Sequence, residues 1–124
     1  MAGLDQIVVD SAHPARLARF WAAVLDGYAI RAYDDAEIAR LAALGLTPET
    51  DPSVMVDGPG PSLCFHLVAQ ANPAKGRLHL DVKTTDRPGE VARLRALGAL
   101  IVREAEGYTV MQDPEANRFC VFQQ

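Results

Sequence analysis

The stretch QIVVDSAHPARLARFWAAVL (residues 6–25) decides the fold, because a strand pattern passes directly into a helix pattern within it. The short β-branched run Leu4–Asp10 predicts a strand. Pro14, after His13, suits the first position of a helix, where its missing N–H costs nothing. Apolar residues then recur at helical spacing at Leu17, Phe20, Trp21, Val24 and Leu25. This stripe predicts a helix of about three turns, ended by Gly27.

The same reasoning extends along the chain. A second helix is predicted after Asp34-Asp35 and ends at Gly45, and a third begins after Asp86 and ends at Gly98. The remaining strands are predicted at Tyr28–Tyr33, Ser53–Val56, Ser62–Ala69, Arg77–Thr84, Leu100–Arg103, Tyr108–Gln112 and Arg118–Phe122. Alternation in the strand Arg77–Thr84 separates an apolar face from a polar one.

The two halves of the chain repeat one unit. Gln6 stands seven residues before His13, as His79 stands seven residues before Asp86. At the far ends, Phe65-His66-Leu67 is matched to Phe119-Cys120-Val121. A helix and loop at about 34–52 occur only in the first half. The prediction is an α+β fold: two βαβββ modules, about 1–70 and 77–124, that form a cupped mixed sheet with helices outside in one domain, 1–124.

Composition excludes several functions. The chain has 124 residues and a formal net charge of −4, without a run of Lys or Arg, so a nucleic-acid partner is not expected. The apolar run Phe20–Leu25 is far shorter than the ~18 residues that a membrane span needs. No basic residue precedes Arg16, which argues against a secretory signal and for a cytoplasmic protein with Cys64 and Cys120 as free thiols.

One candidate site follows from the repeat. In a duplicated fold, equivalent positions of the two modules face each other around a pseudo-two-fold axis. Gln6, His66, His79 and Cys120 each have apolar neighbours that would face the helices. These four side chains are therefore predicted to gather inside the cup.

The chain resembles the vicinal oxygen chelate superfamily, which includes glyoxalase I, extradiol dioxygenases, and fosfomycin- and bleomycin-resistance proteins. The resemblance is carried by Ile7–Trp21, Arg77–Val82 and Asp113–Cys120. It is most similar to the glyoxalase-like domain branch. Proteins of this kind commonly form homodimers, so the resemblance implies a homodimer here.

The resemblance also implies a divalent metal. Its four ligand positions correspond to Gln6, His66, His79 and Cys120, but both carboxylates that superfamily enzymes use are missing. The set suits Zn²⁺ or another borderline metal better than Mg²⁺, and Zn, Ni, Fe and Mn remain the candidates. Because the Glu that serves glyoxalase I as catalytic base is absent, glyoxalase I activity is not implied.

Each candidate residue has a second interpretation. His79 is either a metal ligand or a strand histidine bonded to Asp81, and Cys120 is either a ligand or a small buried hydrophobic side chain. Gln6 and His66 can instead line a pocket by hydrogen bonding. Asp81 is the candidate base or the partner that orients a ligand, while Tyr108, like Tyr28 and Tyr33, is a candidate pocket wall.

Two functions remain open at this point. One is a protein that binds a small organic molecule in the cup and uses metal-assisted lyase, isomerase or dioxygenase-type chemistry on vicinal oxygens. The other is a metal-free binding protein of the bleomycin-resistance kind, without catalysis. Phosphate-binding Gly-rich loops, Cys-x-x-Cys pairs, His-Glu-x-x-His and Gly-x-Ser-x-Gly are all absent from the sequence.

Overall fold

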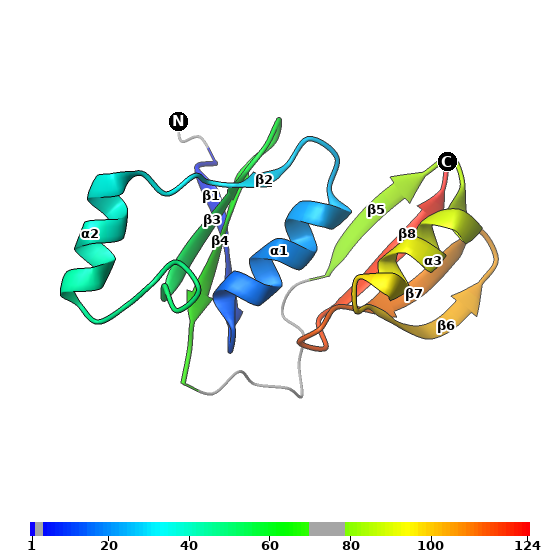
Figure 1. Ribbon diagram of the computed structural model, residues 1–124. Helices are drawn as coiled ribbons and strands as arrows, with labels where there is room; N and C mark the ends of the chain where they lie inside the picture. The colour runs from blue at the N-terminus through cyan, green and yellow to red at the C-terminus, as the bar shows by residue number, and fades with distance from the viewer. Residues whose placement is uncertain (2–3, 70–78) are drawn as a thin grey trace. The chain divides into compact units, whose positions relative to one another are not determined.

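Two four-stranded mixed sheets, one in each half of the chain, form the frame of the protein (Figure 1). The computed structural model describes residues 1, 4–69 and 79–124. The chain divides into two compact units, Met1–Ala71 and Asn72–Gln124. The predicted α+β class is confirmed, whereas the joining of the two sheets into one cup stays a prediction.

The first unit has the sheet order β1-β4-β3-β2, in which β1 pairs with β4 in parallel and the other pairs are antiparallel. Its elements are β1 (Gln6–Ser11), α1 (Pro14–Val24), β2 (Ala29–Ile30), α2 (Asp35–Ala43), β3 (Ser53–Asp57) and β4 (Ser62–Leu67). The helix α2 lies in the predicted insertion and has no counterpart in the described part of the second unit.

The second unit repeats this arrangement with the order β5-β8-β7-β6, and its parallel pair is β5 with β8. Its elements are β5 (Leu80–Thr84), α3 (Arg87–Ala96), β6 (Leu100–Ala105), β7 (Tyr108–Gln112) and β8 (Arg118–Gln123). The part of the predicted strand at Arg77 and Leu78 lies outside the described residues.

The two units make equivalent hydrogen bonds where the first strand of each turns into its helix. In the first unit, the backbone N–H of His13 donates to Ser11 Oγ at 3.0 Å where β1 turns into α1. In the second, the N–H of Asp86 donates to Thr84 Oγ1 at 3.2 Å where β5 turns into α3. His13 and Asp86 are also the N-cap residues of their helices, so the predicted equivalence of these two turns holds.

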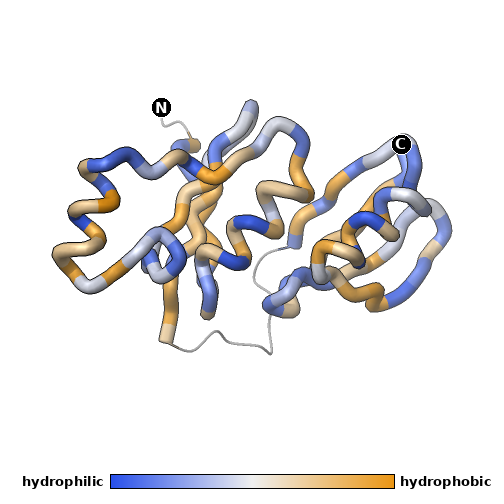
Figure 2. The backbone as a smooth tube through the Cα atoms, viewed as in Figure 1, coloured by the Kyte–Doolittle hydropathy of each residue, from blue (hydrophilic) through white to orange (hydrophobic). Residues whose placement is uncertain are grey.

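Each sheet buries one face beneath the helix of its own unit. Strands β3 and β4 carry mostly hydrophobic residues (Figure 2), and Val54, Val56 and Phe65 on the face toward α1 are fully buried. The fully buried side chains of the two cores include Leu17, Trp21, Val56, Phe65, Leu94, Met111, Phe119 and Val121. We call the opposite face of each sheet, which its own helix does not cover, its open face. Gln6, Val8 and Asp10 lie on the open face of the first sheet, since they are exposed while Val9 and Ser11 are buried.

The predicted strand Tyr28–Tyr33 is wrong in its extent, because only Ala29–Ile30 pair with β3. Both tyrosines are used elsewhere. Tyr28 donates from its hydroxyl to the Pro61 carbonyl at 3.0 Å, and its ring occupies the space that a Cβ on Gly58 would need. Tyr33 donates to Asp51 Oδ2 at 2.7 Å, and burial beside that carboxyl raises the pKa of Tyr33. These contacts anchor both rings against loops of the first unit.

The N-cap of α3 provides a stability prediction. Asp86 Oδ1 accepts the Gly89 N–H at 3.2 Å, and a Cβ on Gly89 would collide with the same carboxylate. Gly→Ala in a helix normally stabilises by roughly 0.5–1 kcal/mol, and an Asp cap contributes about 1 kcal/mol. We therefore expect Gly89→Ala to give no gain in the free energy of unfolding in the native chain, but to stabilise in an Asp86→Ala background. Urea unfolding of the native chain, the two single variants and the double variant measures this. The same gain from Gly89→Ala in both backgrounds would contradict it.

The ion pair between Arg31 and Asp57 provides a pH prediction. Arg31 Nε and Ser62 Oγ lie 2.8 and 2.6 Å from the Asp57 carboxylate, and they lower the pKa of Asp57 from 3.8 to about 2. A depressed carboxyl pKa contributes stability above pH 4 that is lost as the pH falls toward 2. Because both partners are largely exposed, we expect this contribution to stay below about 1 kcal/mol.

The Asp57 side-chain carbon resonance should therefore titrate near pH 2 in the native chain and nearer its ordinary value in Arg31→Gln. Arg19→Gln, which removes a similar exposed pair with Glu49, is the control and should leave the Asp57 titration unchanged. A midpoint near 4 in the native chain would show that the pair does not persist in solution.

No helix within residues 4–69 and 79–124 is long and apolar enough to cross a membrane.

Candidate functional site

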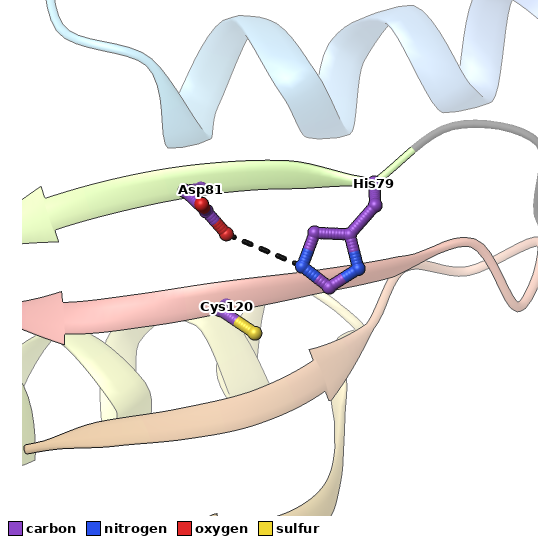
Figure 3. A group of neighbouring side chains, drawn as sticks. All are labelled: His79, Asp81 and Cys120. Carbon is purple, nitrogen blue, oxygen red and sulfur yellow. Dashed lines mark ion pairs between the residues drawn. The ribbon is translucent and has the colours of Figure 1, made fainter.

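Three chemically reactive side chains meet on the open face of the second sheet (Figure 3). They are His79, Asp81 and Cys120, and we call them the His-Asp-Cys cluster. One nitrogen, one carboxylate oxygen and the sulfur of the three residues all lie within 4.8 Å of one another. His79 Nε2 and Asp81 Oδ1 are 3.2 Å apart. In the part of the chain that the structure describes, no second group of this kind is found.

Strand register explains why these residues meet. Asp81 and Cys120 are direct partners in the parallel pair β5 and β8, and His79 lies two residues before Asp81. Residues two apart along a strand point to the same face. Phe119 and Val121, on either side of Cys120, are fully buried, so the thiol between them points away from α3.

The members of the cluster differ in exposure. The side chains of His79 and Asp81 are 52% and 63% exposed, whereas Cys120 is only 6% exposed. Burial raises the pKa of the Cys120 thiol, and the negative charge of Asp81 raises it further, against the opposing effect of Arg103. The thiol is therefore protonated at neutral pH, and it needs a cation beside it to become a thiolate.

The donor set fits a zinc ion. Imidazole nitrogen, thiolate and carboxylate oxygen are the three ligand types that Zn²⁺ takes from proteins. In a tetrahedral zinc site the ligand atoms are separated by about 3.3–3.8 Å, so atoms that already lie within 4.8 Å need only small side-chain adjustments. Three protein ligands also leave a fourth position for water or an organic oxygen, as in catalytic zinc sites.

The other two predicted ligands, Gln6 and His66, are not brought together within the first sheet. Gln6 pairs with Ser62, while His66 pairs with Asp10 at the far end of the same strands. The pairs Gln6–Ser62 and Asp10–His66 are four residues apart along the strands, which is about 13 Å. His66 Nδ1 lies 3.2 Å from Ser53 Oγ instead. A single ion within this sheet cannot bind both Gln6 and His66.

The match of His66 to Cys120 is wrong, because the register makes Cys64 the equivalent of Cys120. The N–H of Val68 donates to the carbonyl of Ser11 in the first unit, as the N–H of Gln124 donates to the carbonyl of Thr84 in the second. Counting back four residues from each donor leads to Cys64 and to Cys120. Both thiols are buried, at 7% and 6% exposure.

Sequence reasoning therefore missed Cys64 as a site candidate. The signal was available in the flanking residues, since Leu63-Cys64-Phe65 and Phe119-Cys120-Val121 are both a cysteine between two core residues. Matching His66 to Cys120 would instead align Leu67, which is 44% exposed, with the fully buried Val121. On the open face of the first sheet, Gln6 and Cys64 hold the diagonal relation that His79 and Cys120 hold in the second.

Tyr108 lies on the open face of the second sheet, beside Phe122. Their rings stack with centroids 5.0 Å apart at an interplanar angle of 26°. The guanidinium carbon of Arg103 lies 5.7 Å from the Tyr108 ring centroid, and its Nη2 is 3.5 Å from the hydroxyl. Tyr108 shares this open face with the cluster, and its role as a wall residue stays a prediction.

A cleft of about 400 Å³ also opens in the first unit, at the start of α1. Its lining residues are Ala12, His13, Pro14, Ala15, Arg16, Glu49, Thr50, Asp51 and Leu67. None of the residues predicted for the site is among them. The cleft and the predicted site are therefore different features.

A family model described as "Glyoxalase-like domain" matches residues 6–122. No curated protein matches significantly. The fold thus defines a protein of the vicinal oxygen chelate superfamily, as the sequence predicted. The chain belongs to the glyoxalase-like domain family.

Solved structures share the fold at low sequence identity. The fosfomycin resistance protein FosX from Mesorhizobium loti has a TM-score of 0.68 at 14% identity, covering 100% of this chain and 93% of that one. A glyoxalase/bleomycin resistance protein/dioxygenase family enzyme from Burkholderia phytofirmans has a TM-score of 0.68 at 13% identity, with 97% of each chain covered. A bleomycin-binding protein complexed with bleomycin has a TM-score of 0.54 at 12% identity, with 99% of each covered.

Proposed function

We propose that the protein binds a small organic molecule on the open face of its second sheet, beside a divalent metal ion held by His79, Asp81 and Cys120. The observation that supports this most directly is the His-Asp-Cys cluster, whose donor atoms lie within 4.8 Å of one another. Zinc is the preferred ion because the donors are one nitrogen, one oxygen and one sulfur.

Each residue of the cluster has a proposed task. A bound zinc ion would act as a Lewis acid toward an oxygen of the organic molecule. His79 and Cys120 are proposed as the anchoring ligands, and the buried position of Cys120 excludes water from one side of the site. Asp81 is proposed as the third ligand, through the oxygen that lies 3.2 Å from His79 Nε2 in the metal-free chain, and its second oxygen is proposed as a proton acceptor.

Tyr108 is proposed to contact the organic molecule, and Gln6 and His66 are proposed as hydrogen-bonding residues on the open face of the first sheet. All three lie on open faces, and each carries a hydrogen-bonding group: an amide, an imidazole and a phenol. His66 already exchanges a hydrogen bond with Ser53 Oγ, which fixes the orientation of its ring. For Gln6 and His66 this role replaces that of ligands to one shared ion, because strand register separates them.

A metal-free binding protein is the second candidate. The contact of His79 with Asp81 at 3.2 Å is a complete ion pair when the histidine is protonated, and it needs no metal. One structural neighbour was solved as a bleomycin-binding protein complexed with bleomycin, which shows that this fold can hold an organic molecule. In this alternative the same open face binds the molecule without chemistry.

A cytoplasmic location is also proposed, as the charge pattern implies.

A homodimer is proposed, as the family resemblance implies. The proposed contact is helix α2, because Ile38 on this helix is 44% exposed and Leu44 directly after it is 65% exposed. Light scattering after size exclusion should give twice the chain mass, and a deletion of residues 34–52 should give a monomer. A monomer for the full chain would contradict this.

Metal analysis of the purified chain separates the two candidate functions. We expect close to one equivalent of zinc, or of another divalent metal, per chain after purification without chelator. Titration of the chelator-treated protein with zinc should recover one equivalent. Protein that neither contains metal nor takes up zinc at micromolar concentration would leave the metal-free binder as the function.

A further inference from the structure

The open face of the second sheet carries an aromatic pair close to the cluster, and the fold does not require it. Register places Lys83, Phe122 and Tyr108 side by side across β5, β8 and β7. The equivalent level of the first sheet holds Asp10, His66 and Ser53, without an aromatic ring. Both rows of residues lie on the open face of an equivalent sheet. Since only the second sheet has aromatic rings there, the fold itself does not require the aromatic pair.

The pair is accessible and electropositive. Phe122 is 37% exposed although it is a large hydrophobic residue, and Tyr108 is only partly buried. The rings stack on each other, and Arg103 lies against Tyr108, 5.7 Å from its centroid. Ring edges carry partial positive charge, and the guanidinium adds a full charge beside them. Such a surface attracts the face of an electron-rich ring and an anionic group attached to it.

The orientation of such a ligand follows from the charges on the same face. The neighbouring row of paired residues across the sheet has one residue on each of its four strands: Asp81, Cys120, Val110 and Arg103. Asp81 therefore lies at the β5 edge and Arg103 at the β6 edge, roughly 14 Å apart at the usual strand spacing. In the metal-free chain an anionic group is repelled by Asp81 and attracted by Arg103. Lys83 is a second cation, beside Phe122 on β5, but it is Arg103 that lies against the Tyr108 ring.

We infer that the small molecule bound here is a planar aromatic ring that carries a carboxylate. This rests on the proposed function, since it names the class of molecule for the same open face. The ring packs against the edges of Phe122 and Tyr108, and the carboxylate binds the Arg103 guanidinium. The Tyr108 hydroxyl accepts a hydrogen bond from Arg103 at 3.5 Å, so its own proton is free for donation to the carboxylate.

Three probes test this by NMR titration of the full chain labelled with ¹⁵N. Benzoate has the ring and the charge, cyclohexanecarboxylate has only the charge, and benzamide has only the ring. We expect benzoate to shift the amides of Arg103, Tyr108 and Phe122 saturably, and to bind at least about fivefold more tightly than either other probe. Equal affinities for all three probes, or shifts confined to the first unit, would overturn the inference.

Arg103→Gln and Arg31→Gln are matched variants, since both arginines are exposed but Arg31 is held by the carboxylate of Asp57. Benzoate affinity should fall about fivefold in Arg103→Gln and stay unchanged in Arg31→Gln. An equal effect of both variants would overturn the inference.

The benzoate titrations are run without zinc and repeated with one equivalent of zinc. Benzoate binding needs no metal. If the protein does not bind zinc, the benzoate titration is still valid, and if it does not bind benzoate, the zinc measurement is still valid.

Discussion

Replacing His79 with alanine is expected to lower the zinc affinity of the protein by at least roughly a hundredfold, since residues that merely support a metal ligand already contribute 10–100-fold. Cys120→Ser should have a comparable effect, because it removes the thiolate that Zn²⁺ prefers. Asp81→Asn should weaken binding less, about tenfold, because it keeps an oxygen but loses the charge. Competition with a chromophoric chelator measures all three affinities.

His13→Ala is the control for this series. His13 is also a histidine, at the N-cap of α1 in the other unit, and its side chain makes no cap hydrogen bond. Its removal should leave zinc affinity unchanged. His66→Ala should also leave it unchanged, because His66 lies on the first sheet and pairs with Asp10 and Ser53. Equal losses for His79→Ala and His66→Ala would contradict a site built from the second unit alone.

Zinc binding should also depend on pH in a defined direction. Burial and Asp81 raise the pKa of the Cys120 thiol, so zinc must displace its proton. Below that pKa the apparent affinity should rise about tenfold for each unit of pH, and Cys120→Ser should remove this part of the dependence. An apparent affinity that is constant between pH 6 and about 8 would show that the thiol is not a ligand.

Phe119→Ala is expected to lower the free energy of unfolding by about 3–5 kcal/mol, whereas Phe122→Ala should cost only about 1 kcal/mol. Both phenylalanines lie on β8, but Phe119 is fully buried on the face that packs against α3 and Phe122 is 37% exposed on the open face. The first change leaves a cavity in the core. The second removes mainly the stacking contact with Tyr108.

Urea unfolding followed by circular dichroism measures both changes. Phe65→Ala, in the first unit, is the matched core variant, because Phe65 is fully buried as well and is the structural counterpart of Val121 next to Phe119. It should be as costly as Phe119→Ala. If Phe122→Ala were as destabilising as Phe119→Ala, the assignment of the open face would be wrong.

The sequence predicts most of the fold because the signals are local. Helical spacing from Leu17 to Val24, the Asp34 and Asp86 caps, and β-branched alternation in the strands all act within a few residues. The strand at Tyr28–Tyr33 was predicted too long, because its tyrosines pack against a glycine-rich turn and against Asp51 far along the chain. Propensity does not contain these long-range contacts.

The site could be predicted only in part. Alternation placed His79 and Asp81 on one face, and their contact at 3.2 Å is the one foreseen in the structural interpretation of His79. The choice between His66 and Cys64 depends on the parallel register of β1 with β4, which is set by pairing between distant strands. Because a shift of two residues keeps every side chain on the same face, alternation alone cannot distinguish the two matches.

Cobalt substitution tests the central claim, a metal site made of His79, Asp81 and Cys120, most directly. Co²⁺ in place of zinc reports a sulfur ligand through a thiolate-to-metal charge-transfer band in the near ultraviolet. The matched variants are Cys120→Ser and Cys64→Ser, which remove equally buried thiols at equivalent positions of the two units. We predict a stoichiometric band in the native chain and in Cys64→Ser, and none in Cys120→Ser. Cobalt that gives no charge-transfer band in the native chain, or a band that survives in Cys120→Ser, would contradict the account.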